Sequence, residues 1–106
     1  MTLNEAQADV CKQIAHSKLK SLSPEHALCH AVTGLTEEAG EVAGLLKREI
    51  FKQNIQPKDR WVEELGDVFW YLCAAASEKG LTLEDIFKAN QAKLKIRYGD
   101  WENESK

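Results

Sequence analysis

The sequence predicts an all-α protein, and three observations support this class. Apolar residues recur at spacings of three and four along most of the chain, and residues that cap helices precede several of these stretches. Only two prolines and six glycines are present, which leaves few break points for many strands. We expect a compact four-helix bundle. Because a chain of 106 residues buries a smaller fraction of its surface than a larger protein, we expect oligomerisation to complete the bundle.

The first predicted helix covers residues 3–16, and the second begins at Pro24. Thr2 and Glu5 have the spacing of a capping box, in which each side chain accepts a hydrogen bond from the other residue's backbone. Ser23 is a suitable N-cap, and proline is favoured at the first helical position because its missing N–H would have no helical partner there. These signals predict where both helices begin.

The third predicted helix runs from near Lys58 to near Gly80, and the fourth from Thr82 to about Tyr98. Each of them carries apolar residues on one side. The whole chain is expected to form one domain, in which residues 100–106 are a flexible polar tail.

Acidic residues repeat in two windows, residues 37–42 (EEAGEV) and residues 63–68 (EELGDV). At 100° per residue, the third acid of each window lies roughly 40° and 60° around the helix from the first two. Apolar residues flank both groups, so we expect the acids to line a groove between the second and third helices. If the windows lie level in an antiparallel hairpin, the second helix ends near Lys47, and residues 48–56 form the connector.

Such a groove requires either protonation of some acids or bound cations. Two like charges about 4 Å apart repel by roughly 4 kcal/mol at an effective dielectric constant near 20. Because every candidate ligand is a carboxylate oxygen, Mg²⁺ is favoured, with Mn²⁺ as a substitute, and Mg²⁺ commonly binds substrate phosphates beside a few carboxylates. His26 and His30 lie one turn apart but have no evident third nitrogen or sulfur ligand, so zinc is not expected.

The composition argues against several other classes of protein. The net charge of −3 does not favour nucleic-acid binding, and the longest apolar run is too short to span a membrane. The N-terminus does not resemble a signal peptide. The three cysteines form no Cys-x-x-Cys pair and are interpreted as buried free thiols, which suits a reducing cytoplasm.

The two acidic windows also carry a family resemblance. Glu37-Glu38-Ala39-Gly40-Glu41, followed after 22 residues by Glu64-Leu65-Gly66-Asp67, resembles the E-E-x-x-E and E-x-x-D motifs of MazG-like nucleoside triphosphate pyrophosphohydrolases. The resemblance extends over about residues 28–98. It implies an enzyme that hydrolyses nucleoside triphosphates to a monophosphate and pyrophosphate, with housecleaning of nucleotide pools as one compatible role. It also implies a homodimer or homotetramer.

The resemblance further implies roles for individual residues. The Mg²⁺ ligands would be Glu38, Glu41, Glu64 and Asp67. The candidate catalytic acids are Glu37 and Glu38, of which Glu37 either joins a second metal or helps to position and deprotonate water. Glu63 has no assigned role and can simply face outward.

Four further residues are candidates for substrate binding. Asn90, Lys93 and Arg97 follow one another at helical spacing, so one face of the fourth helix can reach phosphates or sugar. Trp70 either approaches the base or fills the core, and the core is the stronger interpretation. His16 remains unassigned, and the base preference is not readable.

Two other functions stay open. Phosphoribosyl-ATP pyrophosphohydrolase has a related fold and related metal chemistry, and a non-catalytic helical module would bind nucleotide without turnover. A di-iron bundle is disfavoured because Glu-x-x-His pairs are absent around these acids.

Overall fold

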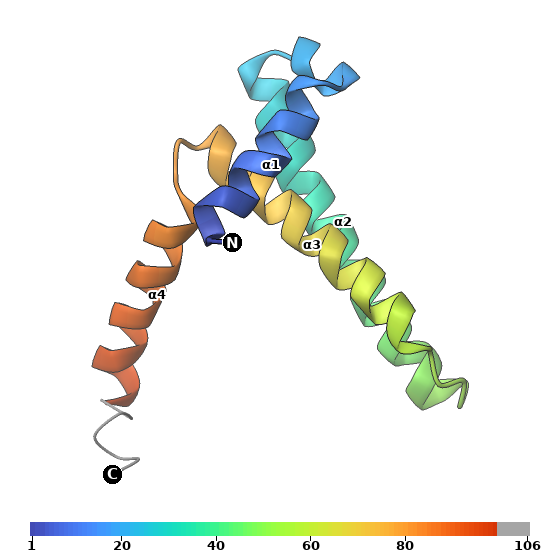
Figure 1. Cartoon of the computed structure of the whole chain (residues 1–106). Helices are drawn as coiled ribbons and strands as arrows, with labels where there is room; N and C mark the ends of the chain where they lie inside the picture. The colour runs from blue at the N-terminus through green and yellow to red at the C-terminus, as the bar shows by residue number, and fades with distance from the viewer. Residues whose placement is uncertain (100–106) are drawn as a thin grey trace.

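The computed structural model describes residues 1–99 and contains four α-helices, one short 3₁₀ helix and no strand in that range. The all-α class and the four predicted helices are confirmed (Figure 1). The predicted tail of residues 100–106 lies outside the described residues. In chain order the elements are α1 (Leu3–Ala15), η1 (Lys18–Ser21), α2 (Pro24–Phe51), α3 (Lys58–Glu78) and α4 (Leu83–Tyr98).

The N-caps follow the expected chemistry. Thr2 and Glu5 form the complete capping box of α1. The Ser23 side chain accepts a hydrogen bond from the backbone N–H of His26, with Pro24 as the first residue of α2. These contacts give partners to N–H groups that the first turn of a helix leaves free.

The helices α2 and α3 form a long hairpin, and here the predicted end of the second helix was wrong. α2 continues to Phe51, one turn beyond Lys47. The reason is Glu49, whose carboxylate accepts hydrogen bonds from the backbone N–H of Gln56 (3.1 Å) and from Nε1 of Trp61 (2.8 Å). These bonds fasten the last turn of α2 to the start of α3, and they leave only a short connector.

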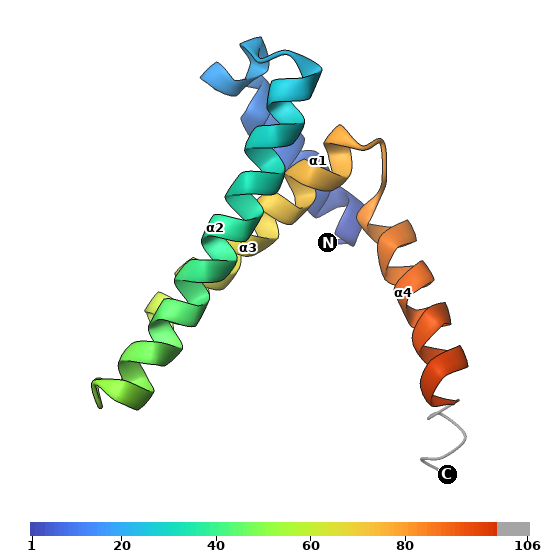
Figure 2. The same cartoon turned by 180° about the vertical axis from the view of Figure 1, so that it is seen from behind.

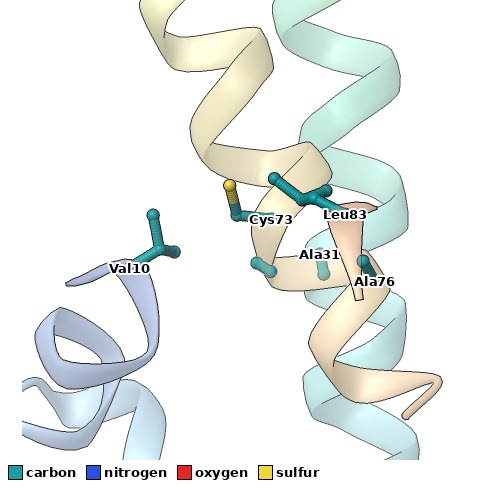
Figure 3. Packing of buried hydrophobic residues seen from close by; sticks show 6 residues of the cluster. Val10, Ala31, Cys73, Ala76 and Leu83 are labelled. Atoms are coloured by element: carbon teal, nitrogen blue, oxygen red, sulfur yellow. The ribbon is translucent and has the colours of Figure 1, made fainter. Parts of the chain in front are cut away.

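A small apolar core lies where α1, α2, α3 and the start of α4 meet (Figure 3). Cys73 of α3 is fully buried, as predicted, whereas the prediction of burial was wrong for Cys11 and Cys29, which are exposed. Most of the other members are small, so the helix backbones approach closely at this point. The buried members are Val10, Ala31, Cys73, Ala74, Ala76 and Leu83.

One buried polar residue ties α1 to the turn between α3 and α4. The side-chain amide of Gln7 donates to the hydroxyl of Ser77 and to the carbonyl of Leu81, both at 2.9 Å. Its carbonyl oxygen accepts from the backbone N–H of Leu83, also at 2.9 Å. The turn itself passes through Gly80, whose φ of 69° is readily adopted by glycine.

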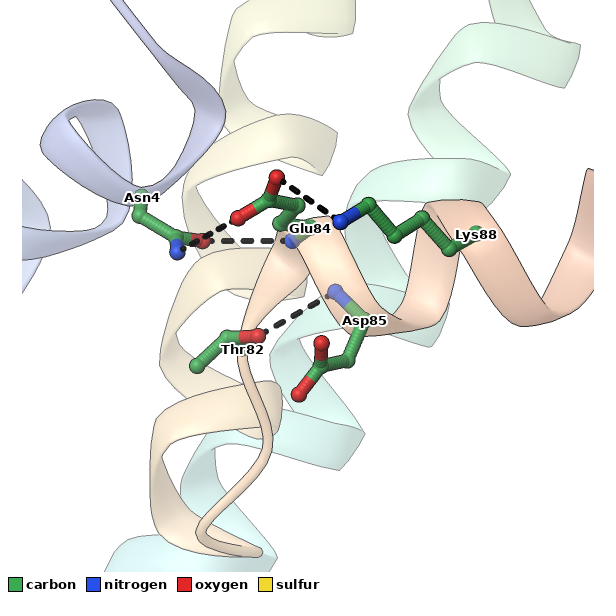
Figure 4. Close-up of polar contacts among 5 residues, drawn as sticks. All are labelled: Asn4, Thr82, Glu84, Asp85 and Lys88. Carbon is green, nitrogen blue, oxygen red and sulfur yellow. Dashed lines mark hydrogen bonds and ion pairs between the residues drawn. The ribbon is translucent and has the colours of Figure 1, made fainter.

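A second set of contacts holds the first turn of α4 against α1 (Figure 4). Asn4 donates to the carboxylate of Glu84 at 3.3 Å and accepts from its backbone N–H at 3.2 Å. Thr82 caps the helix by accepting from the N–H of Asp85, and Lys88 pairs with Glu84 at 3.2 Å. The base of α4 is therefore fixed in position by α1.

Beyond this base, α4 diverges from the hairpin, as two opposite views show (Figures 1 and 2). The radius of gyration is 17.0 Å, whereas a compact domain of about 100 residues has roughly 13 Å. The four helices are thus more open than a closed bundle. Apolar residues expected to face a core are consequently exposed, among them Leu65 (52%) and Phe87 (54%). Among the described residues, no helix has both the length and the apolar character that crossing a membrane requires.

Candidate metal centre

Three carboxylates of the two acidic windows come together on the hairpin. Glu38 lies on α2, and Glu64 and Asp67 lie one turn apart on α3. One carboxylate oxygen from each residue can be chosen so that all three lie within 4.8 Å of one another. These three acids lie together on α2 and α3, where the sequence predicts a groove.

The charges in this cluster oppose one another at Glu38. Partial burial raises the pKa of the Glu38 carboxyl, and the negative charges of Asp67, Glu64, Glu37 and Glu41 raise it further. The charges of four acids therefore act on the Glu38 carboxylate. Glu38, Glu64 and Asp67 form the closest group of the five. A cation bound there would relieve the repulsion.

Arg60 supplies part of the missing positive charge. It lies one turn before Glu64 on α3, and its guanidinium is 3.3 Å from the Glu64 carboxylate and 4.0 Å from that of Glu63. Glu64 is only 7% exposed, so this ion pair offsets the cost of burying its charge. Arg60 has no role predicted from the sequence, although its position four residues before an acid in a helix is a signal that could have identified it.

The remaining predicted acids lie around the cluster. Glu41 is exposed one turn after Glu38 and lies outside the group of three, although its charge acts on Glu38. Glu37 is exposed on the neighbouring side of α2 and lines a separate cavity there. Glu63 is exposed and paired only weakly with Arg60.

Two aromatic residues border the acids. Trp70 and Tyr71 line a cavity of about 310 Å³ together with Glu38 and Asp67. Trp70 also packs against the core, and its Nε1 donates to the side-chain oxygen of Gln13 at 2.6 Å. Tyr71 meets the Trp70 ring edge-on, with centroids 5.1 Å apart. Trp70 therefore packs against the core and also borders the acids, and its contact with a base stays a prediction.

Comparison with known proteins identifies the family. The model of the MazG nucleotide pyrophosphohydrolase domain matches residues 28–100, which is more than half of the chain. The chain belongs to the MazG family. The match covers all of the hairpin from Leu28 and all of α4, so it contains both acidic windows.

Two relatives of this MazG domain share about a third of their aligned residues with it. An uncharacterized protein, YvdC of Bacillus subtilis, is 34% identical over 73 residues, which cover 60% of this chain and 69% of YvdC. The Gene 37 protein of Mycobacterium phage L5 is 31% identical over 74 residues, which cover 66% of this chain and 65% of that protein. No solved structure matches the chain at a comparable significance.

The donor set of this MazG domain fits a hard divalent cation. MazG proteins generally depend on divalent metal, and the three clustered ligands are all carboxylates, which suit Mg²⁺ or Mn²⁺. Burial is the largest cause of the raised pKa of Glu38, and four neighbouring negative charges add to it, although Arg60 pairs with Glu64. Three protein oxygens would leave further positions on a six-coordinate ion for water and phosphate.

The predicted residues of α4 lie elsewhere in the single chain. Asn90, Lys93 and Arg97 are exposed on a helix that diverges from the hairpin (Figure 2). Asn90 lines an apolar hollow between α3 and α4 rather than the acidic groove. One chain therefore does not bring these three residues to its own acidic cluster.

Proposed function

We propose that the protein is a Mg²⁺-dependent nucleoside triphosphate pyrophosphohydrolase. The observation that carries the proposal is the cluster of Glu38, Glu64 and Asp67 in a chain of the MazG family. In the proposed reaction, one water molecule cleaves the anhydride between the α and β phosphates. The products are a nucleoside monophosphate and pyrophosphate.

The acids would divide the work between binding and proton transfer. Glu38, Glu41, Glu64 and Asp67 would hold Mg²⁺, which offsets phosphate charge and lowers the pKa of water. Glu37 and Glu38 are the candidate acids for orienting the attacking water and accepting its proton.

We also propose that the active form is a homo-oligomer. Val62, Leu65, Phe69 and Leu72 form an exposed apolar stripe along α3, and each is at least 37% exposed. This stripe continues into the hollow that α3 forms with the base of α4. Apolar surface of this kind is stabilised by burial against another subunit, and a second copy is the partner that the family resemblance implies.

An oligomer would also explain the position of the α4 residues. If Asn90, Lys93 and Arg97 bind phosphate or sugar, then α4 of one copy must reach the acidic cluster of another. Lys93 and Arg97 would then lie opposite the acids, with the substrate between them. Their positive charges would attract its negatively charged phosphates.

The proposed reaction is tested by resolving products from a panel of canonical and modified nucleoside triphosphates and phosphoribosyl-ATP. Each substrate is incubated with Mg²⁺, with Mn²⁺ and with chelator. We expect monophosphate and pyrophosphate in equal amounts, and none with chelator. Release of diphosphate and phosphate would contradict the assigned bond. Turnover of phosphoribosyl-ATP alone would assign the protein to that reaction, and binding without any turnover would indicate a non-catalytic module.

A further inference from the structure

Arg60 brings positive charge to the edge of the acidic cluster, and the proposed chemistry gives it no task. Its guanidinium lies 3.3 Å from the Glu64 carboxylate and 4.0 Å from that of Glu63. Within residues 1–99, no other basic side chain pairs with an acid of either window. Lys93 and Arg97 lie on α4, which diverges from the hairpin (Figure 2). Arg60 is therefore the cation that this chain supplies to its own acids.

The position of Arg60 along α3 marks one end of the site. Arg60, Glu64 and Asp67 follow one another at spacings of four and three residues, so they share one face of the helix. Trp70 and Tyr71 come one turn after Asp67 and line the acidic hollow with it. The guanidinium and the two aromatic rings consequently lie at opposite ends of the row of acids.

Arg60 and Glu64 differ in how far they are buried. The Glu64 side chain is 9% exposed, whereas the Arg60 side chain is 41% exposed. The guanidinium thus pairs with a nearly buried carboxylate and is also open to solvent. Because a guanidinium has five N–H donors, this pairing leaves donors for a second anion. A divalent cation at the acids would share the charge of Glu64, so more of the charge of Arg60 would remain for that anion.

We propose that Arg60 binds the β- and γ-phosphates of the substrate, the part that leaves as pyrophosphate. The inference rests on the proposed function, in which water attacks the α-phosphate at the acids. Arginine and phosphate often form two parallel hydrogen bonds, which are stronger than bonds between neutral groups. The polyphosphate carries the charge of a nucleotide, so it belongs at the cationic end of the site rather than beside the aromatic rings.

The ligand class that follows is a Mg²⁺-bound pyrophosphate group, either free or as part of a nucleotide. In the proposed reaction, the bond between the α phosphorus and the bridging oxygen breaks. That oxygen keeps the electron pair and leaves with the pyrophosphate. Arg60 would stabilise the negative charge that develops on this leaving group.

Arg60→Gln tests this through binding of inorganic pyrophosphate, measured by calorimetry in excess Mg²⁺. The affinity should fall about tenfold or more, the loss expected when a hydrogen bond between charged groups is removed. Arg60→Lys keeps the charge without the planar fork and should recover part of the affinity. Lys58→Gln is the matched control, because Lys58 is an exposed cation two residues earlier, on the opposite face of α3, and it should bind pyrophosphate as the wild type does.

Binding of Mn²⁺ alone separates phosphate binding from a structural role at Glu64. Arg60 repels a cation, so Arg60→Gln should bind Mn²⁺ at least as tightly as the wild type, measured by paramagnetic resonance of the free ion. A loss of pyrophosphate affinity no larger than the loss of Mn²⁺ affinity would show that Arg60 only holds Glu64, and would overturn the inference. Unchanged pyrophosphate affinity would overturn it as well. If Arg60→Gln does not fold, the same two measurements on Arg60→Lys decide.

The two proposals can fail separately. If the wild type hydrolyses nucleoside triphosphates but binds pyrophosphate no better than Arg60→Gln, the reaction stands and the role of Arg60 is wrong. If the wild type hydrolyses no nucleotide but binds Mg²⁺-pyrophosphate through Arg60, the phosphate site stands and the reaction is wrong. If the wild type neither binds pyrophosphate nor hydrolyses nucleotides, both proposals are overturned.

Discussion

Glu38 is the residue on which both acidic windows act. Its carboxylate lies among the charges of Asp67, Glu64, Glu37 and Glu41, and these raise its pKa together with partial burial. A glutamate whose pKa is higher in the folded than in the unfolded state makes folding less favourable as pH rises from the ordinary glutamate pKa through the raised one. At neutral pH, the charge of Glu38 therefore lowers the stability of the metal-free protein and also attracts a cation to the site.

Glu38→Gln should consequently stabilise the metal-free protein while it damages the site. The amide removes one charge from the repulsive group, so the melting temperature at neutral pH, measured with chelator, should rise by a few degrees. Because Glu38 is protonated at pH values below its pKa, the difference should disappear in acid. Added Mg²⁺ should stabilise the wild type but not the variant, since only the wild type gains free energy from binding. A lower melting temperature for the metal-free variant would contradict this account.

Asp67→Asn and Glu41→Gln test the metal site through activity. Each variant replaces a proposed ligand by a neutral amide, so each should keep the helical circular dichroism spectrum and lose most Mg²⁺-dependent hydrolysis. Glu63→Gln is the control, because Glu63 is exposed and lies outside the carboxylate cluster, and it should remain active. Wild-type turnover by Asp67→Asn would exclude the proposed site.

At the scale of elements, local signals predicted most of the helix boundaries. The N-caps at Thr2, Ser23 and Thr82 are short-range hydrogen bonds, so their residues can be recognised from the sequence. The end of α2 was predicted wrongly because it depends on Glu49 accepting from Trp61, twelve residues away, and no local pattern marks that pair. The same distinction applies to the site. The acids follow from spacing, whereas the packing of Tyr71 on Gly34 joins two helices and requires the fold.

The bond between Glu49 and Trp61 should hold the end of the hairpin together. Trp61→Phe keeps an aromatic ring, smaller than the indole, but removes the donor, and the loss of a hydrogen bond to a charged group should lower the free energy of unfolding by about 1.5–3 kcal/mol. Exchange of the Gln56 amide proton, which bonds the same carboxylate, should accelerate. Glu49→Gln keeps an acceptor oxygen and should cost less. Equal stability of Trp61→Phe and wild type in denaturant would show that this bond does not stabilise the hairpin.

At the scale of the whole molecule, the open angle between α4 and the hairpin leaves apolar residues exposed on both. The sequence marked these residues as core because periodicity reports which face is apolar and does not report which chain covers it. Phe69 and Leu72 of α3 and Phe87 of α4 line one hollow, and all three are more than one third exposed. The divergence of α4 followed from no local signal. A second copy packed on these faces would bury the apolar residues that periodicity predicts to lie in a core.

Leu65→Glu tests that interface. Leu65 is 52% exposed, so a charge there should leave the single chain folded, but it would be buried without a partner in an oligomer. Light scattering after size exclusion should give an oligomer for the wild type and a monomer for the variant. Phe51→Glu, at the tip of the hairpin and off the α3 stripe, should remain oligomeric. A monomeric wild type at micromolar concentration would refute the proposed assembly.

Mixing two inactive variants tests whether α4 of one copy serves the acids of another. Asp67→Asn lacks a proposed metal ligand, and a Lys93→Ala/Arg97→Ala variant lacks the proposed cations of α4. In a symmetric dimer with shared sites, a mixed dimer has one site built entirely from wild-type residues and one with both defects. Random exchange of subunits should then restore about one quarter of wild-type activity. If each chain supplied its own α4 to its own acids, every site in the mixture would keep one defect, and activity would stay at the average of the two variants.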